Sequence, residues 1–426
     1  MFSKAINKVA MFTGLFNKML ALSLTSCLLV ACPRSFGENR STKTLPSVEK
    51  YKGQLYYRPS YFRQMVEIDW QTGFREGLGQ VEVDGKWGFI NSTGKLAIEA
   101  KFDQVIEFNE GLAPVRIGAM INKPKAALFG LIGRWAYIDQ TGRTVIEREG
   151  NSFSEGLATV LVRGKWKTES GLEGTLTKER GRYGVIDKNG RMIVPPKYSL
   201  IKPFSEGLAV FCEQDLTASN AKYGYLSTSG EVAIEPRYDA AMDFSEGLAL
   251  VAVSGKGAFI NRAGDVVIHV PYGVAPSFSE GVVPVKVKNE QKWGYMDKTG
   301  RLVIPFKFDR TMAFSEGYAG VVEDGKIGYI NRKGEYVIKP RFPYYSTWKT
   351  PFGRRYNPFF SSFSEGVAPV MTEKLKWGYI DKKGEFVIGP KFDLAGQFTE
   401  GFAKVAVGDK LGYINKQGDY VWEPTR

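Results

Sequence analysis

The chain has 426 residues, a formal net charge of +13, a single histidine and three cysteines. One histidine without neighbouring cysteines supports neither a zinc site nor a nucleophilic triad. The sequence also contains no Walker motif, dinucleotide fingerprint or Gly-x-Ser-x-Gly elbow. We therefore predict a protein that is not an enzyme and that carries no cofactor or metal. Its basic balance favours an anionic partner, such as phospholipid headgroups or an envelope polymer.

The first 31 residues have the composition of an export signal. Three lysines precede an apolar run of about 13 residues, Met19 to Ala31, which is too short for an ordinary membrane-spanning helix. Leu29-Val30-Ala31-Cys32 resembles the bacterial lipobox, in which the cysteine becomes the first mature residue and receives lipid. We therefore predict lipidation of Cys32. Cys27 ends a similar stretch and is the alternative.

Residues 1–31 are thus predicted to be a lipoprotein signal peptide, and residues 32–50 a polar, lipidated tether. Residues 51–73 are rich in aromatic side chains, and we expect them to be a degenerate unit that caps the fold. This N-terminus predicts a protein anchored by lipid in the bacterial envelope, at the outer membrane or the cell surface. Export argues against nucleic acid as a partner. Plain cleavage or an uncleaved anchor is the alternative.

Residues 74–426 repeat one short phrase nine times. Each copy opens on Phe-x-Glu-Gly, and successive copies start about 34 to 51 residues apart, which is the range of solenoids and propellers. The copies begin at Phe74, Phe108, Phe153, Phe204, Phe244, Phe278, Phe314, Phe363 and Phe398.

Each copy predicts three antiparallel strands. An apolar alternation such as Leu248 to Val251 predicts the first strand, and a tight turn such as Asp324-Gly325 leads to the second, Lys-Trp-Gly-Tyr-Ile in its full form. The glycine inside the second strand indicates a bulge or the close approach of another group. An Asp-Lys-x-Gly turn precedes the third strand, which we expect to end at a proline such as Pro305.

The predicted fold is all-β, an array of about nine antiparallel three-stranded repeats. Unequal spacing and nine copies favour an open, solenoid-like stack over a closed propeller. Neighbouring units would bury the repeated aromatic side chains between them. The structural tryptophans of this core are Trp87, Trp135, Trp293 and Trp377.

The nine Phe-x-Glu-Gly glutamates, among them Glu76, Glu280 and Glu365, occupy equivalent positions. A catalytic pair of carboxylates needs two different environments to separate acid from base, so this equivalence argues against a glycosidase. We expect a structural role in the turn, in which the carboxylate accepts backbone N–H bonds or pairs with the lysine of the second strand.

The phrase Lys-Trp-Gly-Tyr-Ile-Asp-Lys-x-Gly, preceded by Phe-Ser-Glu-Gly and followed by Val-Ile-x-Pro-Lys, resembles the WG-repeat family of bacterial proteins. The resemblance covers about residues 74–426. It implies an all-β fold and a binding or scaffold role, and it brings no catalytic residues. Tyr183, Tyr223, Ile327 and Leu411 stand where Trp is expected, and this variation suits a core position better than a ligand contact.

Four insertions interrupt the repeat. Residues 118–131, 163–179 and 213–221 lie between the first and second strands of three consecutive units and would project from one edge. The fourth lies between units and combines aromatic with basic side chains, which are enriched at interaction hot spots and sugar-stacking surfaces. Its candidate partner-binding residues are Tyr344, Tyr345, Trp348, Arg354, Arg355, Tyr356, Phe359 and Phe360. A loop that folds back on the repeats is the alternative.

Together these patterns predict a non-enzymatic envelope lipoprotein whose repeats bind a protein or a polysaccharide. A structural spacer of the envelope is the second hypothesis. A carbohydrate-active enzyme is the third, and it would require one particular carboxylate whose substitution abolishes turnover without unfolding the protein.

Overall fold

A computed structural model describes residues 73–118, 133–162, 181–216, 218, 220–270, 273–286, 292–345, 348–349, 355–356 and 362–425. It also describes two short paired strands before them, β1 (Lys50–Tyr51) and β2 (Gln54–Leu55). The predicted signal peptide, Cys32 and most of the predicted cap lie outside the described residues.

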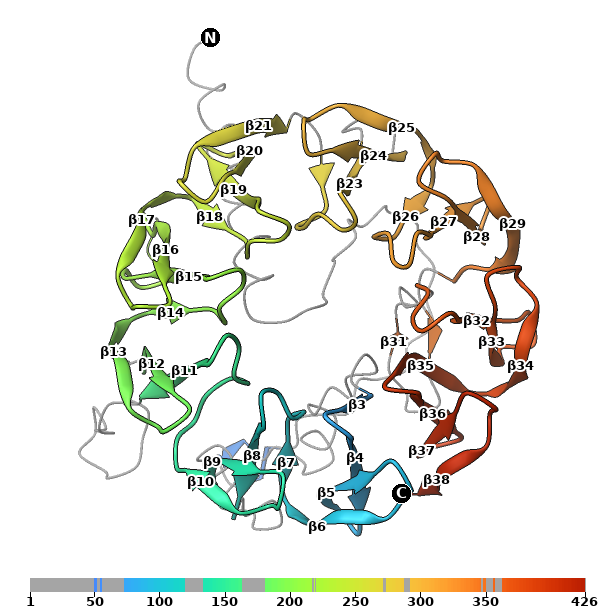
Figure 1. The fold of residues 1–426 in the computed structure, drawn as a ribbon, viewed down its shortest axis with the longest axis horizontal. Coiled ribbons are helices and arrows are strands. Elements are labelled where there is room, and N and C mark those ends of the chain that lie inside the picture. The colour runs from blue at the N-terminus through green and yellow to red at the C-terminus, as the bar shows by residue number, and fades with distance from the viewer. Residues whose placement is uncertain are drawn as a thin grey trace.

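Nine antiparallel sheets follow one another around a closed ring (Figure 1). We call these sheets blades 1 to 9 in chain order. Each blade is built from consecutive strands, so no blade combines strands from the two ends of the described chain. The short strands and the Phe-x-Glu-Gly hairpins lie toward the centre of the ring, and the longest strands form its outer rim (Figure 1).

From the centre outward, blades 1 to 3 contain β3 (Phe74–Arg75), β4 (Leu78–Val83), β5 (Lys86–Asn91) and β6 (Leu96–Phe102); β7 (Gln104–Val105), β8 (Leu112–Ile117), β9 (Arg134–Asp139) and β10 (Thr144–Ile146); and β11 (Leu157–Val162), β12 (Arg182–Asp187) and β13 (Met192–Tyr198). In the same order, blades 4 to 6 contain β14 (Leu200–Ile201), β15 (Leu208–Cys212), β16 (Tyr223–Ser227) and β17 (Val232–Tyr238); β18 (Ala240–Ala241), β19 (Ala249–Val253), β20 (Lys256–Ile260) and β21 (Val266–Val270); and β22 (Gly273–Val274), β23 (Val282–Lys286), β24 (Trp293–Asp297) and β25 (Leu302–Phe308). Blades 7 to 9 contain β26 (Arg310–Thr311), β27 (Ala319–Glu323), β28 (Lys326–Ile330) and β29 (Tyr336–Pro343); β32 (Ala368–Met371), β33 (Trp377–Ile380) and β34 (Phe386–Phe392); and β35 (Leu394–Thr399), β36 (Phe402–Val407), β37 (Lys410–Asn415) and β38 (Tyr420–Thr425).

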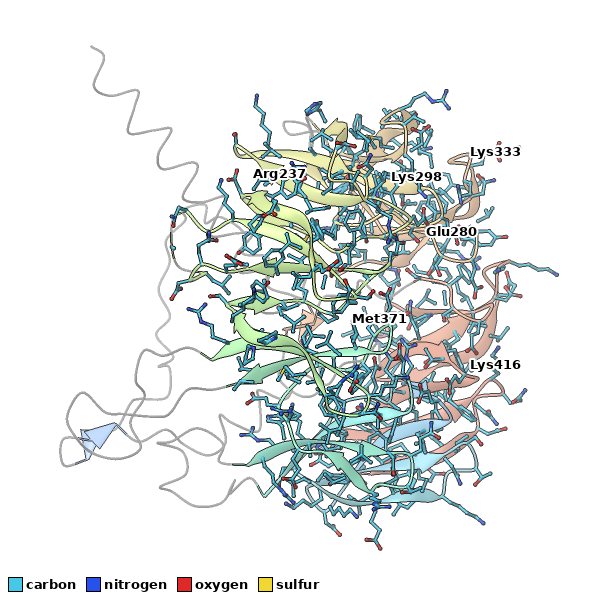
Figure 2. All side chains as sticks on the ribbon, turned by 60° about the vertical axis from the view of Figure 1, so that its left-hand side comes forward. Arg237, Glu280, Lys298, Lys333, Met371 and Lys416 are labelled. Carbon is cyan, nitrogen blue, oxygen red and sulfur yellow. The ribbon has the colours of Figure 1, made fainter. Side chains whose placement is uncertain are left out.

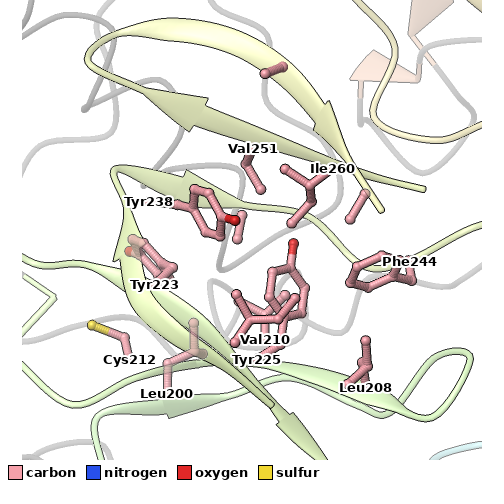
Figure 3. Packing of buried hydrophobic residues seen from close by; sticks show 14 residues of the cluster. Leu200, Leu208, Val210, Cys212, Tyr223, Tyr225, Tyr238, Phe244, Val251 and Ile260 are labelled. Atoms are coloured by element: carbon pink, nitrogen blue, oxygen red, sulfur yellow. The ribbon is translucent and has the colours of Figure 1, made fainter. Parts of the chain in front are cut away.

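Aromatic side chains fill the spaces between neighbouring blades. The core between blades 4 and 5 contains Tyr225, Tyr238 and Phe244, packed with aliphatic side chains from both sheets (Figure 3). The rings of Tyr225 and Phe244 meet edge to face with their centroids 4.9 Å apart. The same contact joins Tyr379 to Phe398 at 4.8 Å. The hairpin phenylalanine of each such blade therefore packs against the preceding blade.

The ring is closed by contacts between blade 9 and blade 1, so the expectation of an open array is wrong. Phe74 packs against Phe402 and Tyr413, with ring centroids 4.4 and 5.2 Å apart. The Tyr413 hydroxyl donates a hydrogen bond to the Gln80 carbonyl at 2.9 Å. Unequal spacing favours an open array only if it changes the interfaces, but the extra residues lie in connections outside the packed sheets. The contact between neighbouring Phe-x-Glu-Gly hairpins is therefore present at all nine interfaces, and the nine interfaces complete a circle.

Most blades contain four strands, which corrects the expectation of three. The additional strand is short, as in β14, and lies innermost. The outermost strand is also longer than expected, because β25 continues through Pro305 to Phe308. Proline is tolerated on an edge strand, where its missing N–H would face away from the ladder. Prolines at this rim also discourage pairing of the exposed edge with other chains.

The glycine of the Trp-Gly dipeptide lies where the outer strand approaches closely, which confirms the prediction made for it. A Cβ added to Gly294 would lie 2.4 Å from the carbonyl oxygen of Ile304. The pairing of β24 with β25 shifts register between Trp293 and Tyr295. The tight turns are also as predicted, since Asp324 and Gly325 both have positive φ, the conformation of a type I′ hairpin.

Candidate functional site

The ring has two faces of different composition. The hairpin face carries the nine Phe-x-Glu-Gly hairpins and nine turns of the Asp-Lys-x-Gly type, of which eight begin with Asp or Asn and one with Ser227. We call these the Asx turns. The loop face carries the connections between the two middle strands of each blade. Strands alternate in direction, so these two sets of connections lie at opposite ends of the sheets. Glu280, Lys298, Lys333 and Lys416 of the hairpin face lie toward one side of the ring in Figure 2.

Each hairpin glutamate accepts a hydrogen bond from the hairpin of the next blade. The carboxylate of Glu206 accepts from the backbone N–H groups of Glu246 and Gly247, at 2.5 and 2.8 Å. The donor glycines, in order around the ring, are Gly111, Gly156, Gly207, Gly247, Gly281, Gly317, Gly366, Gly401 and Gly77. Carboxylates and amides thus form a complete circle, which includes the junction of blade 9 with blade 1.

These glutamates have an unusual backbone conformation. All nine have φ between 51° and 56°, in the left-handed region. Glycine, asparagine and aspartate are favoured at such a turn position, and other residues pay about 1 kcal/mol there. Asparagine or aspartate would fit the turn but is one methylene shorter. The reach of the carboxylate to the next blade therefore accounts for glutamate at all nine positions.

Two further contacts repeat on the hairpin face. The Ser205 hydroxyl donates to the Phe244 carbonyl of the next blade at 2.8 Å. Equivalent bonds come from Ser154, Ser245, Ser279, Ser315 and Ser364. Basic residues of the Asx turns also pair with the glutamate of the preceding blade, as Lys298 does with Glu246 at 2.9 Å. Equivalent pairs join Lys188 to Glu110, Arg332 to Glu280, Lys382 to Glu316 and Lys416 to Glu365.

These contacts favour the ionised glutamates. Burial acts to raise the pKa of Glu110, but the Gly156 N–H and the Lys188 ammonium outweigh it and hold the pKa below its usual value of 4.5. The pKa of Glu246 is lowered in the same way, because Lys298 and the Gly281 N–H outweigh its burial. Glu110 and Glu246 are therefore charged at neutral pH, and both carboxylates hold neighbouring blades together.

Of the two kinds of partner predicted for the glutamates, the structure confirms the backbone N–H groups and not the lysine of the second strand. The carboxylates do accept backbone N–H bonds, but from the next blade. The lysine of the Trp-Gly strand pairs on the loop face instead, as Lys376 does with Asp393 at 2.6 Å. Lys86–Asp103, Lys222–Asp239 and Lys292–Asp309 repeat this pair. The ion pair between the Asx-turn lysine and the glutamate could not be predicted from the sequence, because the two side chains belong to separate repeats that come together only when the blades pack.

The four predicted tryptophans differ in burial. Trp377 is 1% exposed, whereas Trp87, Trp135 and Trp293 are half-buried. Trp87 packs against the core between blades 1 and 2. All four lie in the strands that pair with the outer rim.

All four insertions begin at the loop face. Residues 119–132 follow β8, residues 163–180 follow β11, and residues 213–222 join β15 to β16, so each connects the two middle strands of its blade. The fourth follows β29. There the Tyr344 N–H donates at 2.8 Å to the carbonyl of Gly325, which belongs to the loop-face turn of blade 7. The three insertions therefore begin at one edge of the ring, as predicted, and the fourth begins at the same edge.

Two of the eight candidate partner-binding residues fold back on the ring. Tyr344 and Tyr345 are half-buried and pack against the cores on either side of blade 8. The guanidinium of Arg310 lies 5.8 Å from the centroid of the Tyr344 ring, and burial raises the pKa of the Tyr344 hydroxyl.

The other six candidates follow these tyrosines. Trp348, Arg355 and Tyr356 belong to a small antiparallel hairpin of β30 (Trp348–Lys349) and β31 (Arg355–Tyr356). In this hairpin Trp348 is the register partner of Tyr356. Arg354, Phe359 and Phe360 lie outside the described residues.

Other chemistry is limited in the part of the chain that the structure describes. Those residues include no group of three or more His, Cys, Asp or Glu side chains placed to hold a metal ion. They also include no helix with the length and apolar character needed to cross a membrane. Cys212 is buried in the core between blades 4 and 5, and this burial raises the pKa of its thiol.

The fold and its links define a class, a nine-bladed β-propeller of short repeats held by contacts between hairpins. A family model for the WG containing repeat matches residues 87–119, 135–166, 183–216, 223–256, 258–290, 293–326, 327–349 and 377–410. The chain belongs to the WG-repeat family. A full match runs from the Trp-Gly strand of one blade into the next blade, so the start of blade 1 and the end of blade 9 together make up the ninth unit.

No curated protein matches the chain. Among solved structures, a eukaryotic initiation factor is similar with a TM-score of 0.51 and 11% identity, over 82% of this chain and 96% of that one. BamB from Moraxella catarrhalis has a TM-score of 0.34 and 11% identity, over 82% and 94%. Virginiamycin B lyase from Staphylococcus aureus has a TM-score of 0.29 and 11% identity, over 64% and 92%. At these identities the likeness concerns the fold alone, and the two lower scores support no conclusion about this chain.

Proposed function

We propose that the chain is a non-enzymatic lipoprotein of the bacterial envelope, anchored through Cys32, and that its ring binds a protein or a polysaccharide through the loop face. The observation that supports this most is the position of the insertions. All four start at the loop face. The hairpin face, in contrast, uses its carboxylates, hydroxyls and lysines to join blades. The connections of the loop face can therefore differ in length while the hairpin contacts stay the same.

The composition of the insertions indicates the kind of partner. Residues 119–132 contain two lysines and no acidic residue, and residues 346–361 contain one lysine, two arginines and no acidic residue. Both also contain large apolar or aromatic side chains. Basic groups beside aromatic rings suit an anionic polysaccharide or an acidic protein surface. Between these, we favour the polysaccharide, since the insertion at 346–361 contributes Trp348, Tyr356 and three phenylalanines as stacking groups.

A binding experiment tests the proposal. The soluble chain beginning at Ser35 would be presented to peptidoglycan, to an anionic polysaccharide and to envelope extract. A variant in which a Gly-Ser linker replaces residues 346–361 should lose most of the binding while its thermal unfolding is unchanged. Lys333→Ala with Lys383→Ala, which removes two exposed lysines of the hairpin face, is the matched control and should bind normally. Equal binding by all three proteins would contradict the role of the loop face.

The anchor is tested separately. Mass spectrometry of the full-length protein purified from membranes should find an acylated N-terminal Cys32. Acylation of Cys27, or an unmodified N-terminus elsewhere, would contradict this part of the proposal and leave the binding result intact.

A structural spacer is the second candidate. It is favoured by the repeated interface, which makes each blade an interchangeable unit. In that case loop replacement would have no effect in cells, whereas removal of a whole blade would.

A further inference from the structure

Eight of the nine interfaces between blades are crossed by the chain, and one is not. At each of the eight, the outermost strand of one blade leads into the next blade. The interface between blade 9 and blade 1, which we call the seam, joins the two ends of the described ring only by contacts. A covalent link limits how far two blades can separate, and the seam lacks this limit.

The interface between blades 8 and 9 shows what a fully equipped contact contains. The Ser364 hydroxyl donates to the Phe398 carbonyl at 2.7 Å. Lys416 pairs with Glu365 at 3.2 Å. At the outer rim, Lys391 donates to the Gly418 carbonyl at 3.1 Å.

At the seam, another residue stands in place of the donor of each of these three contacts. Thr399 stands in place of the serine, and its buried hydroxyl has no hydrogen-bond partner among the described residues. The β-branched side chain has fewer rotamers with which to find one. Ser92 replaces the basic residue of the Asx turn, and Thr425 replaces the rim lysine.

The seam nevertheless keeps a specific closing contact. The Glu400 carboxylate accepts from the N–H groups of Glu76 and Gly77, at 2.8 Å each. The apolar packing of Phe74 against Phe402 and Tyr413 is also retained. The seam is therefore built to close in one register, but with fewer polar links than the interface between blades 8 and 9.

We propose that the seam is a clasp, the one interface at which the native ring opens and recloses while the other eight stay shut. The hairpins of blades 1 and 9 separate during opening, and the bonds from Glu76 and Gly77 to Glu400 break. Opening exposes Phe74 and Phe402 and frees the two ends of the ring to move apart. The clasp does not depend on the proposed function, because it follows from the blade contacts alone.

Native-state hydrogen exchange, read at single amides by NMR or by electron-transfer fragmentation, tests the clasp. The Gly77 amide at the seam is compared with the Gly401 amide, which donates to Glu365 in the interface between blades 8 and 9. Both glycines follow a glutamate and precede an apolar residue, so their intrinsic exchange rates are closely matched. We expect Gly77 to exchange at least about tenfold faster, because it needs only local opening. Equal rates at the two amides would overturn the proposal.

Two matched variants make the test specific. Ser92→Lys restores the missing basic residue opposite Glu400 and should slow exchange at Gly77 about two- to fivefold, the effect of a partly exposed ion pair. Thr228→Lys introduces the same side chain at the equivalent exposed turn position of blade 4 and should leave Gly77 unchanged. If both variants slow Gly77 equally, the exchange reports global unfolding and the clasp is contradicted.

Discussion

The hairpin face and the loop face are made from the same nine repeats, yet the hairpin face is nearly the same in every blade and the loop face differs from blade to blade. On the hairpin face every blade presents Phe-x-Glu-Gly with the same backbone conformation and the same bond to its neighbour. On the loop face the connections range from two-residue turns such as Asp84-Gly85 to insertions such as residues 163–180. Repetition therefore marks contacts that hold the ring, whereas variation marks the loop-face connections that take no part in the hairpin contacts.

The largest expected effect comes from the interior of a hairpin. Phe398 is 1% exposed and packs against Tyr379, so Phe398→Ala should lower the free energy of unfolding by about 3 to 5 kcal/mol. Val387 on the outer rim is 51% exposed, and Val387→Ala should change the free energy of unfolding by less than about 0.5 kcal/mol. Urea unfolding measures both. Equal losses would show that the hairpin phenylalanine is not part of the core.

The next effect separates the carboxylate from the turn. Glu246→Ala removes the acceptor for Gly281 and the partner of Lys298, and should cost about 2 kcal/mol. Glu246→Gln keeps one acceptor oxygen but loses the charge, so about 1 kcal/mol is expected. Glu99→Gln, at an exposed position of the outer rim, is the control and should be neutral. A neutral Glu246→Ala would contradict the role of the circle of glutamates.

Acid should weaken the links of the hairpin face. The folded-state pKa values of Glu110 and Glu246 are lowered, so these groups contribute stability that is present above the unfolded value of 4.5 and is lost as pH falls below it. The melting temperature should therefore fall between about pH 5 and pH 3. Glu110→Gln with Glu246→Gln should flatten this dependence. An unchanged slope in the double variant would assign the acid effect to other groups.

The smallest effect compares one backbone conformation on the two faces. Leu375, in the loop-face turn of blade 8, has φ of 57° and is 40% exposed. Leu375→Gly relieves this strain and should stabilise the protein by about 0.5 kcal/mol. Glu246→Gly relieves the same strain but loses two links to the neighbouring blade, so it should destabilise. Calorimetry on the two variants should give shifts of opposite sign.

Much of each blade could be predicted from the sequence, because the signals are local. Apolar alternation predicts the first of the two middle strands, and the repeated Lys-Trp-Gly-Tyr-Ile phrase predicts the second. Asx-Gly pairs predict the tight turns between them. The innermost strands have two residues in most blades, which is too few for a periodic pattern. Pro305 was interpreted as a strand end because the sequence does not say which strand is an edge.

Closure of the ring could not be predicted, for a different reason. The contact of Glu400 with Gly77 joins residues separated by 323 positions. The motif repeats at every blade, and it is the same whether the last copy meets the first or remains free. Only the angle between neighbouring blades decides this, and that angle arises from packing. The position of the fourth insertion on the loop face could not be predicted from the sequence either, because it depends on the contact of Tyr344 with Gly325.

The construction of every blade from consecutive strands has a consequence for the order of the blades along the chain. No sheet combines strands from the two ends of the described ring, so no sheet requires those ends to lie at one particular blade. A circular permutant that begins in the loop-face turn of another blade would break the connection between the two middle strands of that blade. It would keep all nine contacts between Phe-x-Glu-Gly hairpins. A permutant cut between two blades would keep every sheet whole and move the seam. Gene rearrangements of this kind would leave the same ring, with its ends at a new place.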